Sequence, residues 1–122
     1  MAEALRQVLL VEDEPLVLRS TAEILAADGY QVLEACDYDE ALAHIEAAPE
    51  TTLLVTDINL CGERDGIALA RSVAERWPHV RIVIVSGAVR PAGGEYPEKA
   101  IFFTKPYPPG ALLTLVNDSA HW

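Results

Sequence analysis

The chain has 122 residues, which fits one domain, and its 51% hydrophobic content favours a folded domain over a disordered segment. Its formal net charge is −10, and 19 acidic residues against 9 basic ones argue against a nucleic-acid binder, which needs a basic face. The first residues lack the apolar stretch of a signal peptide, and no apolar run is long enough to cross a membrane. We therefore expect a cytoplasmic protein that binds neither nucleic acid nor membranes.

The first strand and helix are predicted within the first 30 residues. Residues 8–11 are uniformly apolar and include β-branched valines, which favours a strand. Pro15 opens a helix, since its missing N–H costs nothing in a first turn, and Gly29 ends that helix. The apolar side chains of this helix are expected to form its buried face: Leu16, Leu18, Ala22, Ile24, Leu25 and Ala26.

A second strand is predicted over residues 31–35, and Cys36 is expected to be a small core residue. Asp37 and Glu40 have the spacing of a capping box, so a second helix is expected to begin there. Pro49 ends this helix, because proline opposes a helix interior.

The remaining chain continues this alternation. It predicts three more strands and two more helices, namely strands over 53–56, 81–85 and 101–104 and helices over 66–77 and 110–117. Strands that alternate with helices through short links imply a parallel sheet. Residues 87–99 break the pattern, because two prolines and three glycines oppose a regular helix there. We expect a loop or one irregular turn in this segment.

Polar side chains follow four of the predicted strands. Glu12 and Asp13 follow the first strand, Asp57 the third, Ser86 the fourth and Lys105 the fifth. In an open α/β sheet, functional groups collect beyond the carboxyl ends of the strands. Three carboxylates that converge there repel one another unless a hard cation such as Mg²⁺ is bound. The sequence therefore predicts a functional site with a divalent cation at this edge.

The motifs around these residues resemble those of the receiver domain of two-component response regulators, the CheY-like family. They are VLLVEDEP, VTDINL, the Asp65-Gly66 step, IVSGA and FFTKPY, in the family's order and spacing. The resemblance covers nearly the whole chain and implies that residues 1–122 form one receiver domain. It also implies a doubly wound, flavodoxin-like α/β fold, with helices on both faces of a five-stranded parallel sheet of strand order 2-1-3-4-5.

The resemblance implies a magnesium site. Asp13 and Asp57 would bind Mg²⁺ directly, Glu12 would act through a bound water, and the backbone carbonyl of Asn59 would complete the protein ligands. Glu12 stands where the family more often has aspartate, so its carboxylate reaches one methylene further.

The resemblance also implies how the chain reacts. Asp57 would be the nucleophile that takes a phosphoryl group from a histidine kinase or phosphotransfer protein, and Lys105 would contact that group. Ser86 would bind a phosphoryl oxygen after the reaction, and Phe102 would be the aromatic switch residue. The peptide bond that precedes Pro106 would be cis. Such a domain is a phosphoacceptor that catalyses its own phosphorylation and dephosphorylation, not an enzyme acting on other substrates, and it signals to a protein partner.

Two departures and three alternatives remain. The loop between Asp57 and Asp65 lacks the family's usual proline, and the irregular segment 87–99 lies where many relatives have a helix used for dimers, so we expect a monomer. A haloacid-dehalogenase-type phosphatase would need an aspartate at Asn59. A flavodoxin-like redox protein would need a phosphate loop in place of the acids after the first strand. The third alternative is a degenerate receiver that acts only as a protein-binding module.

Overall fold

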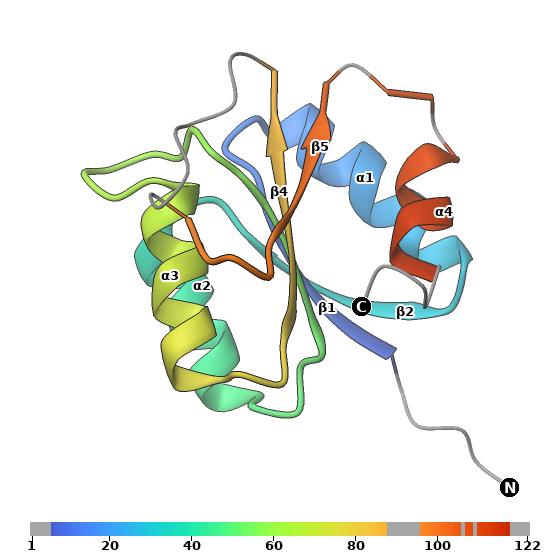
Figure 1. The fold of residues 1–122 in the computed structure, drawn as a ribbon. Helices are drawn as coiled ribbons and strands as arrows, with labels where there is room; N and C mark the ends of the chain where they lie inside the picture. Colours follow the sequence, from blue (N-terminus) through green and yellow to red (C-terminus); the bar gives the residue numbers. More distant parts are fainter. Residues whose placement is uncertain (1–5, 88–95, 106, 109, 118–122) are drawn as a thin grey trace, which may run out of the picture.

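The computed structural model describes residues 6–87, 96–105, 107–108 and 110–117. Five strands form one parallel sheet in the order β2-β1-β3-β4-β5, with helices on both faces (Figure 1). This confirms the predicted fold class and strand order. The strands are β1 (Arg6–Val11), β2 (Tyr30–Ala35), β3 (Leu53–Asp57), β4 (Arg81–Ser86) and β5 (Ile101–Thr104). The helices are α1 (Pro15–Ala27), α2 (Tyr38–Ala47), α3 (Gly66–Arg76) and α4 (Ala111–Asn117).

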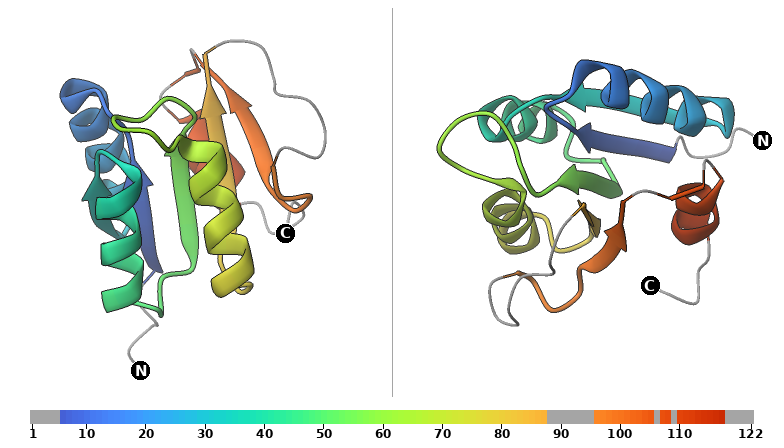
Figure 2. Two further views of the ribbon diagram at one scale, coloured as in Figure 1. Left: turned by 90° about the vertical axis from the view of Figure 1, so that its left-hand side faces the viewer. Right: turned by 90° about the horizontal axis from the view of Figure 1, so that it is seen from above.

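The central strands are apolar on both sides because helices cover both faces of the sheet. In Figure 2, α2 and α3 lie on one face, and α1 and α4 lie on the other. Leu54 packs in the core cluster of α2 and α3, whereas its neighbours Leu53 and Val55 pack in the cluster of α1 and α4. Such uniformly apolar strands are typical of a buried parallel sheet.

Side chains at their first turns fix the starts of α2 and α3. The Glu40 N–H donates to Asp37 Oδ1 (2.8 Å), as a capping box predicts. The Glu40 carboxylate accepts from the N–H of Cys36 (2.8 Å), one residue before the N-cap residue Asp37, so the second half of the predicted box is displaced by one residue. Asp65 caps α3 by accepting from the Ala68 N–H (2.9 Å).

Among the helices of the described ranges, none is long and apolar enough to cross a membrane.

Three of the predictions about burial are wrong. Leu16 is 82% exposed and Ala26 is exposed, whereas Ala22 and Leu25 are buried. Leu16 lies about 200° around the helix from Leu18, so both cannot face the sheet. Cys36 is exposed, because the chain leaves the sheet after Ala35 and turns toward the α2 cap.

The irregular segment before β5 is described only in part. Residues 88–95 lie outside the described ranges, as does Pro106 with the peptide bond that precedes it. Residues 96–100 form no helix, and the Ala100 N–H donates to the Pro97 carbonyl (3.0 Å) in a turn. The Lys99 ammonium donates to the carbonyls of Pro78 and Val80, both at 2.7 Å, which ties this turn to the loop between α3 and β4.

Candidate functional site

The sheet brings the predicted acidic residues together. Val11 and Thr56 are partners in the ladder of β1 and β3, so the residues that follow them emerge at the same edge. Carboxylate oxygens of Glu12, Asp13 and Asp57 all lie within 4.8 Å of one another. Glu12 is buried, at 5% exposure, and the other two are half-buried. Three negative groups are thus held close in a partly desolvated place.

Lys105 lies against two of these carboxylates. It follows β5, and its N–H donates to the Ser86 carbonyl (2.8 Å), which continues the pairing of β5 with β4. Its ammonium donates to Glu12 Oε1 (2.8 Å) and to Asp57 Oδ2 (3.1 Å). The lysine therefore links residues of three strands that are distant in sequence.

Burial and neighbouring charges shift the pKa of two groups in this cluster, Glu12 and Lys105. Burial raises the pKa of the Glu12 carboxyl, hydrogen bonds from Lys105 and from the Glu14 N–H oppose that rise, and the charge of Asp57 adds to it. Burial acts to lower the pKa of the Lys105 ammonium, but its hydrogen bonds to Glu12 and Asp57 outweigh this effect and raise the pKa. The lysine thus stays charged, and it pairs with two of the three clustered carboxylates.

The donor set fits a hard divalent cation. Clustered carboxylate oxygens are the ligands that Mg²⁺ and similar ions take from proteins. Asn59 lies two residues past Asp57, in the exposed loop that leaves β3, so its carbonyl is near in sequence to the cluster. The repulsion among the carboxylates gives a physical reason for such a cation to bind.

Ser86 and Phe102 occupy different depths of the sheet. Ser86 is the last residue of β4, is 7% exposed, and directly follows Val85, the ladder partner of Asp57. Phe102 pairs with Ile84, two residues further from the edge. Its half-buried ring meets the ring of Tyr96 edge to face, with centroids 4.5 Å apart and planes at 71°.

Sequence reasoning did not single out Tyr96. It lies in the glycine- and proline-rich segment, where no periodic pattern marks a buried side chain. The sequence offered one indication of such a contact, which is that Tyr96 is an aromatic residue close in sequence to the predicted switch residue Phe102. Its contact with Phe102 joins the irregular segment to β5.

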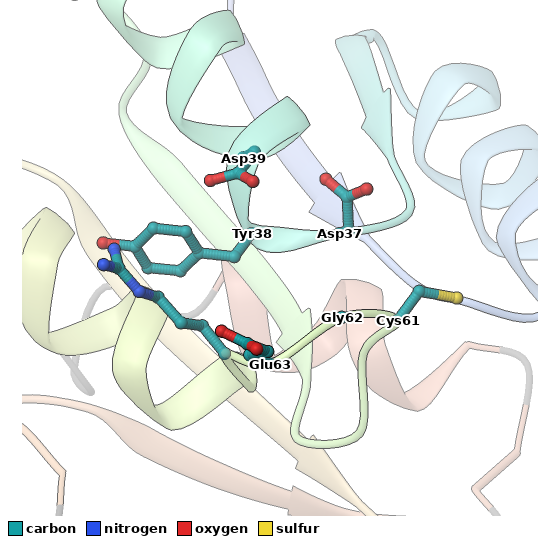
Figure 3. A pocket seen from close by; sticks show the side chains of 7 residues that line it. Asp37, Tyr38, Asp39, Cys61, Gly62 and Glu63 are labelled. Atoms are coloured by element: carbon teal, nitrogen blue, oxygen red, sulfur yellow. The ribbon is translucent and has the colours of Figure 1, made fainter.

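A separate polar cavity of about 390 Å³ lies between the start of α2 and the loop that precedes α3 (Figure 3). Its lining residues are Asp37, Tyr38, Asp39, Cys61, Gly62, Glu63 and Arg64. The Arg64 guanidinium lies 4.7 Å from the centroid of the Tyr38 ring, and Asp37 and Cys61 form an isolated parallel bridge. None of the three clustered carboxylates at the sheet edge lines this cavity, so the predicted chemistry is not placed there.

Comparisons with known proteins agree with this arrangement. A family model described as "Response regulator receiver domain" matches residues 8–117. The response regulator receiver protein CpdR of Brucella abortus is 31% identical over 118 residues, which are 93% of this chain and 93% of CpdR. The nitrogen assimilation regulatory protein NtrX of Azorhizobium caulinodans is 41% identical over 81 residues, which are 66% of this chain but 18% of NtrX.

Solved structures show the same similarity. A CheY-like receiver domain protein from Methanospirillum hungatei aligns with a TM-score of 0.81 and 28% identity, over 93% of this chain and 91% of that one. The receiver domain of the hybrid histidine kinase CckA aligns with a TM-score of 0.76 and 32% identity, over 90% of this chain and 94% of that domain. Several curated relatives are much longer than this chain, which spans 18% of NtrX and 9% of the sensor protein TorS.

Proposed function

The chain belongs to the response regulator receiver domain family of two-component signalling, and on that basis we propose that it accepts a phosphoryl group on Asp57 and signals its state to a partner protein. The observation that carries the proposal is the position of the Asp57 carboxylate. It lies beside Glu12 and Asp13 and accepts a hydrogen bond from Lys105 at 3.1 Å. A nucleophile among acids and one ammonium, at the carboxyl edge of the sheet, is suited to phosphoryl transfer.

The reaction is a displacement at phosphorus. An Asp57 carboxylate oxygen forms a new O–P bond while the N–P bond of a phosphohistidine on a kinase or phosphotransfer protein breaks. The histidine nitrogen keeps the bonding electrons and takes a proton from solvent, and Asp57 becomes an acyl phosphate. Water attack on that phosphate returns the carboxylate and inorganic phosphate, which ends the signal. Both steps would be catalysed by the receiver itself.

Mg²⁺ would be held by Asp13 and Asp57, by Glu12 through water and by the Asn59 carbonyl. When bound, it would offset the negative charge that gathers on the phosphoryl oxygens. The contribution of the protein itself is to position the reacting carboxylate. Lys105 already orients Asp57 through Oδ2, and its long side chain lets the ammonium follow a phosphoryl oxygen.

The output would run from Ser86 to Phe102. The Ser86 hydroxyl would bind a phosphoryl oxygen, and its movement toward Asp57 would bias Phe102 between two positions. Because the Tyr96 ring contacts the Phe102 ring, a shift of Phe102 would displace Tyr96, which lies in the irregular segment. We therefore propose a response by reordering of residues 87–99 in a monomer that binds a target protein, and not a dimer built on a regular helix.

The alternative is a degenerate receiver that binds partners without being phosphorylated. It is disfavoured because the acceptor, the acids, the hydroxyl residue and the lysine are all present at four adjacent strand ends. A phosphoacceptor receiver and a degenerate receiver differ in one measurable property, which is covalent modification of Asp57.

Intact-mass measurement after incubation with acetyl phosphate and Mg²⁺ tests the acceptor. The wild-type protein is expected to gain one phosphoryl group, and Asp57→Asn none. Asp39→Asn, an exposed acid in the first turn of α2, is the matched control and should be modified like wild type. Equal modification of Asp57→Asn and wild type would refute the assignment, and an unmodified wild type would favour the degenerate receiver.

Beryllofluoride with Mg²⁺, a mimic of the phosphorylated state, tests the output. The protein should stay monomeric by light scattering, and hydrogen exchange in 87–99 should slow. Asp57→Asn, which should not bind the mimic, serves as the control. A tight activated dimer, or unchanged exchange across the segment, would contradict the proposed output.

A further inference from the structure

The backbone of Asp57 lies directly against the start of α3. The Gly66 N–H donates to the Ile58 carbonyl at 2.7 Å. A Cβ atom on Gly66 would lie 1.8 Å from the Asp57 carbonyl oxygen and 2.9 Å from the hydroxyl oxygen of Thr56. Only glycine therefore lets the helix approach the acceptor so closely.

Thr56 holds the same carbonyl group. It is fully buried, at 0% exposure, and its hydroxyl donates to the Asp57 carbonyl at 2.9 Å. Side chains alternate along a strand, and Leu54 faces the α2 and α3 side while Val55 faces the other. Thr56 thus shares the face of Leu54, and its hydroxyl holds the acceptor's backbone from the side opposite the Asp57 carboxylate.

The next peptide unit is also held in place. The Ile58 N–H donates to the Val85 carbonyl of β4 at 3.1 Å, and the Ile58 carbonyl accepts from Gly66. The chain around the acceptor is therefore fastened by β4, by α3 and by Thr56. Of these contacts, the Thr56 hydroxyl is the one that a side-chain substitution can remove without changing the backbone.

We propose that Thr56 is a positioning residue for phosphorylation, because its hydroxyl fixes the Asp57 peptide and so directs the carboxylate toward the incoming phosphorus. This inference rests on the proposed function. In-line attack depends steeply on the position of the attacking atom, and small displacements slow such reactions strongly. A shift of the Asp57 backbone would also move its carboxylate relative to the Lys105 ammonium, which now donates to it.

Two substitutions separate positioning from stability. Thr56→Val keeps the shape but removes the hydroxyl, and Thr56→Ser keeps the hydroxyl but removes a buried methyl group. Both should lower the melting temperature to a similar extent. The initial rate of phosphorylation by acetyl phosphate should fall about three- to tenfold in Thr56→Val and stay near wild type in Thr56→Ser. Thr56→Ala, a second variant without the hydroxyl, should react as slowly as Thr56→Val.

Thr51→Val is the matched control. Thr51 is also fully buried, and its hydroxyl donates to the Ala48 carbonyl at 2.7 Å, at the opposite end of β3. Its phosphorylation rate should equal that of wild type. Wild-type rates in Thr56→Val, or equal slowing in Thr56→Ser, would overturn the inference and leave the proposed function standing. A wild-type protein that gains no phosphoryl group would overturn both.

Discussion

Two polar clusters lie at opposite ends of the sheet, and each holds a basic residue among oxygen atoms. At the amino end, Arg6 donates to Asn117 Oδ1 (3.2 Å) and to the Asp28 carbonyl, and its guanidinium lies 4.3 Å from the centroid of the Tyr30 ring. At the carboxyl end, Lys105 donates to two carboxylates. Both clusters join segments that are far apart in sequence.

The clusters differ in their balance of charge. At the amino end, Arg6 faces one carboxylate, Asp28, at 3.7 Å, and the Asn117 amide donates to Asp28 (2.9 Å) and accepts from Tyr30 (2.9 Å). At the carboxyl end, three carboxylates lie within 4.8 Å of one another, and the Lys105 ammonium pairs with two of them, Glu12 and Asp57. In the first cluster, one positive and one negative side chain balance each other and link β1 to α4. In the second, carboxylates outnumber the ammonium, so a bound cation would reduce their repulsion.

The largest expected effect is that of Lys105→Met, which keeps most of the side chain's length but removes its charge. Without the ammonium, Glu12 loses its cation in a buried position, so the free energy of unfolding in EDTA should fall by about 2 kcal/mol. Urea denaturation measures this loss, and added Mg²⁺ should restore part of it. Lys99→Met, whose ammonium binds only carbonyls among its described contacts, is the control and should show no such restoration.

The next effect is stabilisation of the wild-type protein by Mg²⁺. At a concentration tenfold above Kd, mass action gives about 1.4 kcal/mol, seen as a rise in melting temperature. Asp13→Ala should lose most of that rise. An unchanged wild-type melting temperature at tens of millimolar Mg²⁺ would mean that the carboxyl-end cluster does not bind the ion, and the contrast with the amino-end cluster would fail.

Arg6→Ala should cost about 1 kcal/mol of unfolding free energy, because partly exposed ion pairs and single hydrogen bonds contribute little. Its side chain is 46% exposed, so solvent screens the charge. The loss should be the same in EDTA and in Mg²⁺, unlike that of Lys105→Met. Denaturation curves in both conditions test this, and a loss that Mg²⁺ repairs would mean that the two ends are coupled.

The smallest effect is a dependence on pH that Glu12→Gln should remove. The Glu12 pKa is raised in the folded protein above the ordinary value of 4.5, mainly by burial. From pH 4.5 up to that raised pKa, the folded state holds more protons than the unfolded state, so this group's contribution to stability falls as pH rises. In EDTA, the difference in stability between Glu12→Gln and wild type should grow in favour of the variant across this range. A difference that shrinks there would contradict the raised pKa of Glu12 and its attribution to burial.

The sequence was sufficient to predict the alternation of strands and helices and the edge where the site lies. Each of these rests on patterns local to the chain, such as the apolar runs and the Asp37 and Asp65 caps. The convergence of Glu12, Asp57 and Lys105 then follows from parallel strands sharing one edge.

Features that depend on contacts distant in sequence were not predictable in this way. The exposure of Leu16 is an exception, because the helical period alone places it about 200° from Leu18 on α1 and was enough to predict it. The Thr56 hydroxyl, the tie of Arg6 to Asn117 and the contact of Tyr96 with Phe102 depend on how packed elements meet. Composition and periodicity do not record such pairs.

The hydrogen bond between Lys105 and Glu12 joins residues 93 positions apart, and the one to Asp57 spans 48. Closing a loop of this length costs more chain entropy than closing a short one, and proteins rich in such long-range contacts fold more slowly. On a ribosome, β1 and β3 emerge long before Lys105, so the acids would be gathered without their ammonium. If Asp57 is the acceptor, as proposed, the site would be complete only when β5 joins the sheet, and partly folded chains would not be phosphorylated.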